Sequence, residues 1–273
     1  MLTAEQKQKL DAQNQKISDN MDRIKHRIAV FSGKGGVGKT MVSVNLAYAL
    51  HFSNKAAGIL DADITGPNVP KMLGLQGHPE NINDLLQPQI KEGVRAISIA
   101  SMMSDDQALI WRGPMRSKLI NQFLGDVEWG YLDYLIADLP PGTGDEILTI
   151  AQQMKPDLAI VVTTPQEVAL LDAGRAVNMA KEIDIPHIGL IENMSGLICP
   201  ECSHTIDLFG SGGGRKLAKE LDIPCFGVIP IDVEARRLSD QGKPYVLEKW
   251  QSEISVEFIK IADKINQLFE SQS

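Results

Sequence analysis

The stretch Gly33–Thr40, GKGGVGKT, has the residue types and spacing of a loop that binds the phosphates of a nucleotide. It follows the apolar segment Ile28–Phe31 and precedes a segment of helical character, which is the setting that such a loop requires. Its glycines let successive backbone N–H groups turn toward phosphate oxygens, and the next helix adds the positive end of its dipole. We expect nucleotide contacts from the whole loop, which comprises Gly33, Lys34, Gly35, Gly36, Val37, Gly38, Lys39 and Thr40.

The loop contains two lysines, for which we predict different roles. Lys39 is expected to reach the β- and γ-phosphates, and the Thr40 hydroxyl to bind Mg²⁺. Lys34 leaves the start of the loop, pointing away from the phosphates that its own loop would hold. We hypothesise that it crosses a two-fold axis and neutralises charge on the phosphoryl group transferred in a second copy. Met41 stands where a second hydroxyl residue often contacts the α-phosphate, so we expect somewhat weaker binding.

Three aspartates follow apolar runs in the segments GILDADITGPN and YLIADLPPGTGDE. Because open α/β sheets bind ligands at the carboxyl ends of their strands, we expect these acids beside the phosphate loop. Asp138 would bind Mg²⁺ directly or through water, Asp61 would support the metal, and Asp63 would orient the attacking water. The catalytic set is then Lys34, Lys39 and Asp63. The prolines and glycines after Asp138 predict a loop that changes conformation when the γ-phosphate leaves.

The sequence also suggests how the base is recognised. Asn193, in the segment IENMSG, follows an apolar run, and its amide can both donate to and accept from adenine. The segment PIDVEARRLSDQGKP could form the other wall of that pocket. A guanine signature of the NKxD type is not seen in the sequence, so ATP is favoured over GTP.

Two of the three cysteines, Cys199 and Cys202, are separated by two residues in the segment LICPECSH. This spacing lets both thiolates bind one metal ion, but a tetrahedral site needs two more ligands. His204 is too close in sequence, and Cys225 lies in an apolar run and is expected to be a core thiol. One chain therefore supplies half a site, and two chains together could hold a [4Fe–4S] cluster or zinc. A redox pair is the weaker alternative, because that motif begins a helix after a strand.

The elements that position these residues follow from short apolar runs that alternate with segments long enough for helices. This order predicts one α/β domain with a mainly parallel sheet of about seven strands, flanked by helices. Residues 1–27 form a polar extension, either a marginal amphipathic helix or a frayed tail, and residues 28–273 form the ATPase domain. The expected strands are residues 27–32, 56–61, 94–100, 134–140, 158–164, 187–193 and 225–230, and the expected helices are residues 40–52, 116–124, 146–154, 168–182 and 252–269.

The last of these helices has an apolar stripe, formed by Ile254, Phe258, Ile261, Ile265 and Leu268. A membrane-surface helix would need a basic polar face, but the charges here are mixed. We therefore expect this stripe to pack against the sheet.

Composition and charge narrow the class of protein. The 273 residues carry a formal net charge of −8, which argues against non-specific binding to nucleic acid. No apolar run reaches the length of about 18 residues typical of a membrane span, and the N-terminus lacks the apolar core of a signal peptide. These features predict a cytoplasmic protein without membrane or nucleic-acid partners, in which cysteines bind metal or are buried.

Taken together, the motifs resemble those of the Mrp/NBP35 family of P-loop ATPases, which includes the ApbC-like iron–sulfur cluster carriers. The family belongs to the deviant-Walker-A group, with MinD, ParA and the nitrogenase iron protein. The matching segments are GKGGVGKT with Lys34, DADITGPNVP, WRGPM, DLPPGTGDE, ENMSG followed by CPEC, and IPIDVEARRLSDQGKP. Thr65 in the second segment is a small local variation.

The resemblance implies a homodimer with slow, dimer-dependent ATPase activity that holds an iron–sulfur cluster at shared cysteine pairs and passes it to apo-proteins. Three alternatives remain open from the sequence: a positioning ATPase resembling MinD or ParA, a zinc-bridged dimeric ATPase, and an electron donor resembling nitrogenase reductase. The first would use a basic surface, and the last would have single, widely spaced cysteines, so neither fits this chain as well as a carrier does.

Overall fold

The computed structural model describes residues 3–64, 66–102, 113–142, 144–199, 202 and 204–271. Within them a nine-stranded, mostly parallel sheet forms the centre of the protein. Its strands are β1 (Ile24–Phe31), β2 (Ala57–Asp61), β5 (Gln89–Lys91), β6 (Val94–Ser98), β7 (Leu132–Asp138), β8 (Leu158–Thr163), β9 (His187–Ile198), β10 (Thr205–Ile206) and β11 (Cys225–Ile231).

The spatial order is β10-β9-β8-β1-β7-β2-β6-β5, and β11 also pairs with β9. Only β5 against β6 and β10 against β9 are antiparallel in this sheet. The strands β3 (Asn81–Ile82) and β4 (Leu85–Leu86) form a separate antiparallel pair. All seven expected strands are present, which confirms the α/β fold class, and the higher strand count comes from very short strands at the margins.

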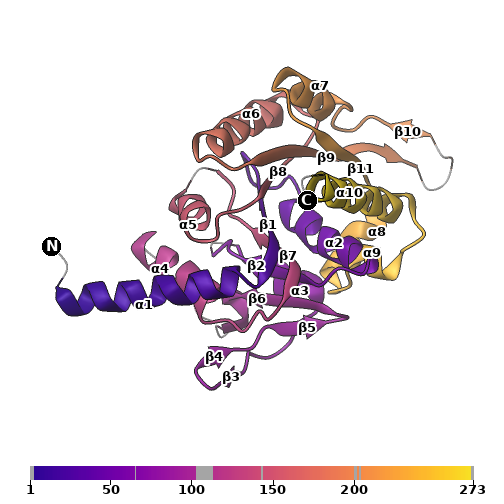
Figure 1. The fold of residues 1–273 in the computed structure, drawn as a ribbon. Coiled ribbons are helices and arrows are strands. Elements are labelled where there is room, and N and C mark those ends of the chain that lie inside the picture. The colour runs from indigo at the N-terminus through magenta and orange to yellow at the C-terminus, as the bar shows by residue number, and fades with distance from the viewer. Residues whose placement is uncertain are drawn as a thin grey trace.

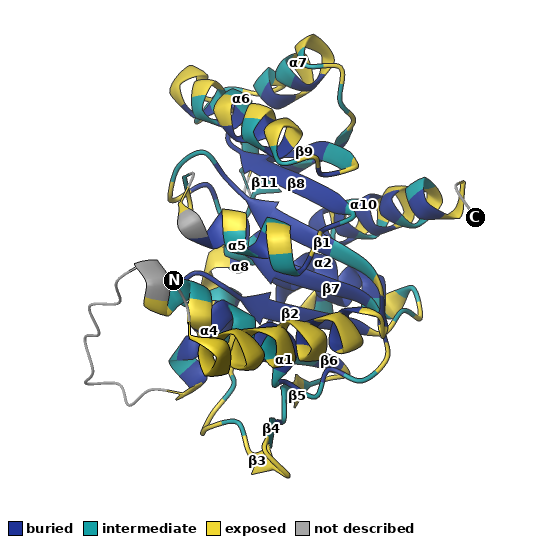
Figure 2. Ribbon diagram, turned by 60° about the vertical axis from the view of Figure 1, so that its left-hand side comes forward, coloured by how far each residue is buried: buried dark blue, intermediate teal, exposed yellow. Residues whose placement is uncertain are grey.

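Helices cover both faces of the sheet, giving three layers (Figures 1 and 2). One face carries α2 (Lys39–Phe52), α3 (Val69–Leu73), α8 (Val233–Asp240), α9 (Tyr245–Glu248) and α10 (Glu253–Glu270). The other carries α1 (Ala4–Met21), α4 (Gly113–Gly125), α5 (Asp145–Gln153), α6 (Glu167–Glu182) and α7 (Gly213–Glu220), and a short 3₁₀ helix spans Ile99–Met102.

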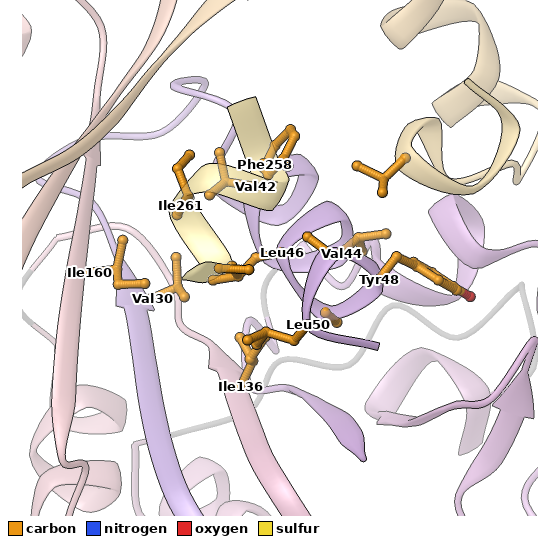
Figure 3. Close-up of a cluster of buried hydrophobic side chains, with 14 of the residues drawn as sticks. Val30, Val42, Val44, Leu46, Tyr48, Leu50, Ile136, Ile160, Phe258 and Ile261 are labelled. Carbon is orange, nitrogen blue, oxygen red and sulfur yellow. The ribbon is translucent and has the colours of Figure 1, made fainter. Parts of the chain in front are cut away.

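The centre of the first layer is α2, the helix that begins at the phosphate loop. Its residues from Val42 to Leu50 are buried almost without exception, between the sheet and α10. Figure 3 shows Val42 and Leu46 of this helix among side chains of β1, β7, β8 and α10. Burial of each such side chain contributes about 1.5–3 kcal/mol. The loop is thus attached to a helix that is buried in the core of this layer.

The C-terminal helix α10 packs against α2 and β11, as the sequence predicts. Ile254, Phe258, Ile261 and Ile265 are buried, and Leu268 packs at the margin of the same core. The apolar stripe therefore belongs to the core and is not presented to a membrane surface. Among the described residues, none of the helices combines the length and apolarity that crossing a bilayer requires.

The N-terminal segment is a helix rather than a frayed tail. Thr3 and Gln6 cap its first turn reciprocally, and its last turns bury Ile17 and Met21 against the second core. The end of α1 that carries the N-terminus reaches beyond the body of the protein (Figure 1). The predicted division between residues 27 and 28 falls inside β1, which begins at Ile24.

Candidate functional site

The phosphate loop and two of the aspartates meet at one edge of the sheet. Strands β1, β7 and β2 are parallel neighbours, and the register pairs Val30 with Asp138 and Asp138 with Asp61. The loop begins at Gly33, three residues after Val30. Because all three strands end at the same level, both carboxylates face the start of α2, and they are fully buried.

Two glycines of the loop have no room for a side chain. Gly38 has a φ of +83° as the N-cap of α2, and a Cβ there would overlap Nδ2 of Asn193. At Gly33 a Cβ would overlap the backbone carbonyl of Asp172 in α6. The loop is therefore clamped between β9 and α6, and only glycine fits at either contact.

Lys39 is buried at the centre of the site, 6% exposed. Its Nζ lies 2.9 Å from Oδ1 of Asp138 and 3.9 Å from Oδ2 of Asp63, in ion-pair contact rather than in aligned hydrogen bonds. The Thr40 hydroxyl donates to Oδ2 of Asp138 and the Ser43 hydroxyl to Oδ1, both at 2.7 Å. Asp138 is thus fixed by one cation and two hydroxyls, all from α2.

Asp61 lies beside this group with a different set of partners. The Ser98 hydroxyl donates to its Oδ2 at 2.8 Å, and the Val69 N–H donates to the same atom at 3.2 Å. Burial, followed by the neighbouring charge of Asp138, raises the pKa of Asp61 to about 8. A carboxyl that keeps its proton near neutral pH lets two acids lie close together without full repulsion.

Asp63 and Lys34 complete the predicted catalytic set, and their surroundings differ. Asp63 is 8% exposed and accepts from the Gly66 N–H at 3.1 Å. Lys34 is half-buried, and the Ser32 hydroxyl donates to its backbone carbonyl at 2.8 Å. Within the described residues no carboxylate forms an ion pair with its Nζ.

The donor set suits a hard divalent cation. Three carboxylates surround one ammonium group, so the site stays negative even when Asp61 is protonated. A hydroxyl and a carboxylate 2.7 Å apart, Thr40 and Asp138, are oxygen ligands of the kind that Mg²⁺ prefers. The residues present therefore fit the magnesium that the sequence predicts.

Asn193 lies next to the loop, with its amide partly engaged. Its Nδ2 donates to the Val37 carbonyl at 2.8 Å, which leaves one N–H and Oδ1 for a base. Farther along β9 a cavity of about 510 Å³ opens, lined by residues that include Leu197, Pro230 and Asp232. Tyr245, also in the lining, donates to Asp232 at 2.6 Å, and burial together with this bond raises the pKa of the phenol to about 12.

The two predicted ligand cysteines lie on a hairpin formed by β9 and β10. Thr205 pairs with Ile198, and the Cys199 N–H donates to the His204 carbonyl at 2.9 Å. Cys199 is half-buried and Cys202 is exposed. Pro200 and Glu201, between them, lie outside the described residues. The hairpin extends from the carboxyl end of β9 (Figure 1).

Cys225 lies far from this pair. It pairs with Leu190 of β9, nine residues before Cys199, which corresponds to roughly 30 Å along a regular strand. The residue is half-buried at the start of β11 rather than in the core, and burial raises the pKa of its thiol. Within the described residues, no third His, Cys, Asp or Glu side chain joins these cysteines in a group that could hold a metal ion.

Three polar residues of this region were not anticipated from the sequence. Ser43 follows Lys39 by one helical turn, a spacing that places both on the same face of α2 and was readable in advance. Ser98 ends the strand next to Asp61, and Glu192 precedes Asn193, but their partners are set by the fold alone. Thr65, Trp111 and Arg112, which belong to the motifs, lie outside the described residues.

Comparison with known proteins agrees with this geometry. The family model described as ParA, NUBPL iron-transfer P-loop NTPase, matches residues 23–266. An iron–sulfur cluster carrier protein of Methanocaldococcus jannaschii is 50% identical over 95% of this chain and 90% of its own length. The carrier protein of Haemophilus influenzae is 45% identical over 89% of this chain and 66% of its own length.

Solved structures extend the likeness to three dimensions. A nucleotide-binding protein of Archaeoglobus fulgidus, solved in complex with ADP, is 38% identical with a TM-score of 0.78, covering 90% of this chain and 96% of that one. The cell division ATPase MinD of Pyrococcus furiosus is 22% identical with a TM-score of 0.67, over 89% of this chain and 99% of that one, and shares the fold. The match to the family model and the identity to these relatives agree with the phosphate loop and the strand-end acids, and confirm the resemblance to Mrp/NBP35 proteins. The chain therefore belongs to the family of NUBPL-type iron-transfer P-loop NTPases.

Proposed function

We propose that the protein is an ATP-hydrolysing carrier that holds a [4Fe–4S] cluster between two copies of the chain and passes it to apo-proteins. The observation that carries the proposal is the half-site on the hairpin: Cys199 and Cys202 are accessible, and Cys225 is too distant to join them. A four-cysteine cluster needs a second such pair, which an identical partner would supply. The relatives named as iron–sulfur cluster carrier proteins support the same cargo.

The nucleotide site supports ATP hydrolysis by positioning and charge neutralisation. Lys39 would bind the β- and γ-phosphates, and Thr40 and Asp138, aided by Asp61, would hold Mg²⁺. When bound, the metal neutralises charge on the phosphate oxygens. Asp63 would orient a water for attack on the γ-phosphorus, breaking the bond to the β-phosphate oxygen and releasing phosphate and ADP. Lys34 of the partner subunit would stabilise the charge on the transferred group.

The surface beside the loop is suited to a second copy. Val168 and Leu171 of α6 are 66% and 68% exposed, and the backbone of that helix contacts Gly33 through Asp172. Exposed apolar side chains at the mouth of a site are typical of protein interfaces. Docking there would bring Lys34 of each subunit toward the nucleotide of the other.

Anaerobic reconstitution with iron and sulfide tests the cluster site. We expect four iron and four sulfide per dimer, as a [4Fe–4S] cluster requires, and a brown chromophore. The variants Cys199→Ser and Cys202→Ser should lose the chromophore, whereas the matched control Cys225→Ser should keep it. Mixing the loaded protein with an apo-enzyme that needs such a cluster should restore the activity of that enzyme.

The same measurement separates the remaining readings. Two cysteine pairs that hold one zinc per dimer without sulfide would favour the zinc-bridged ATPase. Retention of the chromophore in the double cysteine variant would refute the site. A positioning ATPase is not favoured, because the chain has a net charge of −8 and the stripe of α10 is buried.

A further inference from the structure

Strand β9 contacts the phosphate loop and carries the cysteine hairpin. Asn193 donates to the Val37 carbonyl on one face of the sheet. Glu192, its neighbour, faces the opposite side, toward α7, because successive side chains of a strand alternate. From Glu192 to Cys199 is a distance of only seven residues along the chain.

The carboxylate of Glu192 is fully buried and bound by three donors. It accepts hydrogen bonds from the Ser195 hydroxyl, from the Gly212 N–H at 2.8 Å and from the Gly214 N–H. The last two lie at the N-terminal end of α7, which favours a negative charge. A Cβ at Gly214 would lie 2.9 Å from Oε2, so glycine admits the carboxylate to the backbone. Among the described residues the Glu192 carboxylate forms no ion pair, and these three hydrogen-bond donors compensate for the cost of burying its charge.

Between the loop contact and the hairpin, β9 bulges. Its pairing with β11 passes from Asn193↔Ile229 to Leu197↔Ile231, so four steps on one strand face two on the other. Met194 and Gly196 have φ values of +57° and +74°. A Cβ at Gly38 would lie 3.6 Å from Cε of Met194, which places Met194 beside the loop as well. Ser195, the residue that Glu192 binds, lies in the middle of the bulge.

We propose that Glu192 is a positioning residue that holds this bulge rigid, so that changes in the phosphate loop move the cysteine hairpin. The inference rests on the proposed function, since it assumes nucleotide in the loop and cargo on the hairpin. Displacement of Val37 and Gly38 would shift Asn193 and Met194. Because Ser195 is hydrogen-bonded to Glu192, and Glu192 to the start of α7, the bulge does not change its conformation. The displacement of Asn193 and Met194 therefore moves Leu197 and Cys199 as well.

The test is nucleotide-dependent alkylation of Cys202 in reduced, cluster-free protein. Mass spectrometry gives the rate for Cys202 relative to Cys225, which lies near the other end of the strand pair and serves as the internal reference. We expect ATP with Mg²⁺ to change this ratio about fivefold or more in the wild type, the lower range of ordinary coupling between sites. In Glu192→Gln the amide presents an N–H toward the Gly214 N–H, so one of the hydrogen bonds is lost. The ATP-induced change in the alkylation ratio should then be less than about half of the wild-type change. The ATP affinity, measured by calorimetry, should stay within about twofold of the wild-type value.

Ser195→Ala removes one partly buried hydroxyl and should also weaken the response, which keeps the test decisive if Glu192→Gln does not fold. Glu257→Gln is the matched control, because that carboxylate accepts from Val228 N–H at 3.3 Å from the side of α10, whereas Glu192, the β9 partner of Val228, is bound on the side of α7. The control should respond as the wild type does. Wild-type protein that binds no ATP would overturn the proposed function. Wild-type protein that binds ATP without a response, or equal responses in all variants, would overturn only the role of Glu192.

Discussion

At the scale of single residues, Lys39 holds together a buried cluster of acids. Its ammonium contacts Asp138, and Asp61, the neighbour of Asp138 across the strands, has Ser98 as its donor. The cluster needs either protons or a metal ion to balance its charge, because like charges in a low dielectric repel strongly. Proton binding at this site is therefore linked to the stability of the protein.

The variant Asp61→Asn should change how stability depends on pH. Folded Asp61 keeps its proton up to about pH 8, whereas the unfolded chain loses it near pH 3.8. Since the folded state binds the extra proton in this window, the free energy of unfolding falls as pH rises from 3.8 to about 8. Asparagine still accepts from Ser98 but cannot ionise, so this part of the decline should disappear.

Thermal unfolding of nucleotide-free protein between pH 5 and pH 8 measures the effect. The melting temperature of Asp61→Asn should rise relative to the wild type as pH increases. The exposed Asp11→Asn provides the control and should run parallel to the wild type. A constant offset between Asp61→Asn and the wild type across this range would contradict the linkage.

At the scale of elements, the seven main strands could be predicted because buried strands are continuous apolar runs. Five helices could be predicted because the segments that alternate with these runs are long enough for helices. The strands β3, β4, β5 and β10 have two or three residues each, too few for a periodic pattern. The helix α7 begins in a glycine-rich stretch, where local propensity disfavours a helix, and its start is held by Glu192. Contacts of that kind depend on the topology, which the local sequence does not specify.

Helix α1 shows how one side chain can attach an element. Asn20 is buried, and its Nδ2 lies within 2.8–3.2 Å of the carbonyls of Leu124, Gly125 and Val127, at the end of α4. Asn20→Ala should reduce the free energy of unfolding by about 2 kcal/mol, because carbonyls at a buried helix end lose their donor. Urea denaturation provides the measurement.

Asn14→Ala in the exposed part of the same helix is the matched control, and it should change stability by less than about 0.5 kcal/mol. If both variants change the free energy of unfolding by the same amount, the side chain of Asn20 contributes no more to stability than its helix propensity does. The residues that attach α1 are thus in its last turns, although the sequence of that segment is polar and predicts only a marginal helix.

At the scale of the whole molecule, the proposed function makes each subunit incomplete for both of its sites. On this proposal, the phosphate loop and the cysteine pair each need a contribution from a second copy. The sequence predicts this dependence from Lys34 and from the C-x-x-C spacing, since neither residue set has a complete role within one chain, and it stays a prediction. The sequence does not give the distance between Cys225 and the cysteine pair. That distance follows from the pairing of Cys225 with Leu190, which the fold sets.

Mixed dimers test whether Lys34 acts across the axis. Lys34→Ala and Asp138→Asn should each be nearly inactive alone. Co-expressed with two different affinity tags and purified as mixed dimers, they should release phosphate at about half the wild-type rate, because one of the two sites is then intact. Mixed dimers as inactive as either parent would show that the lysine serves its own subunit.

The cysteine hairpin lies at the rim of the sheet, and none of its described residues from Leu197 to Ile206 belongs to either buried core. Its composition can therefore drift without repacking the interior, as long as Glu192 and Ser195 remain at its base. A related protein could therefore bind a different cargo after exchange of about ten residues of the hairpin, while the rest of the fold stays the same.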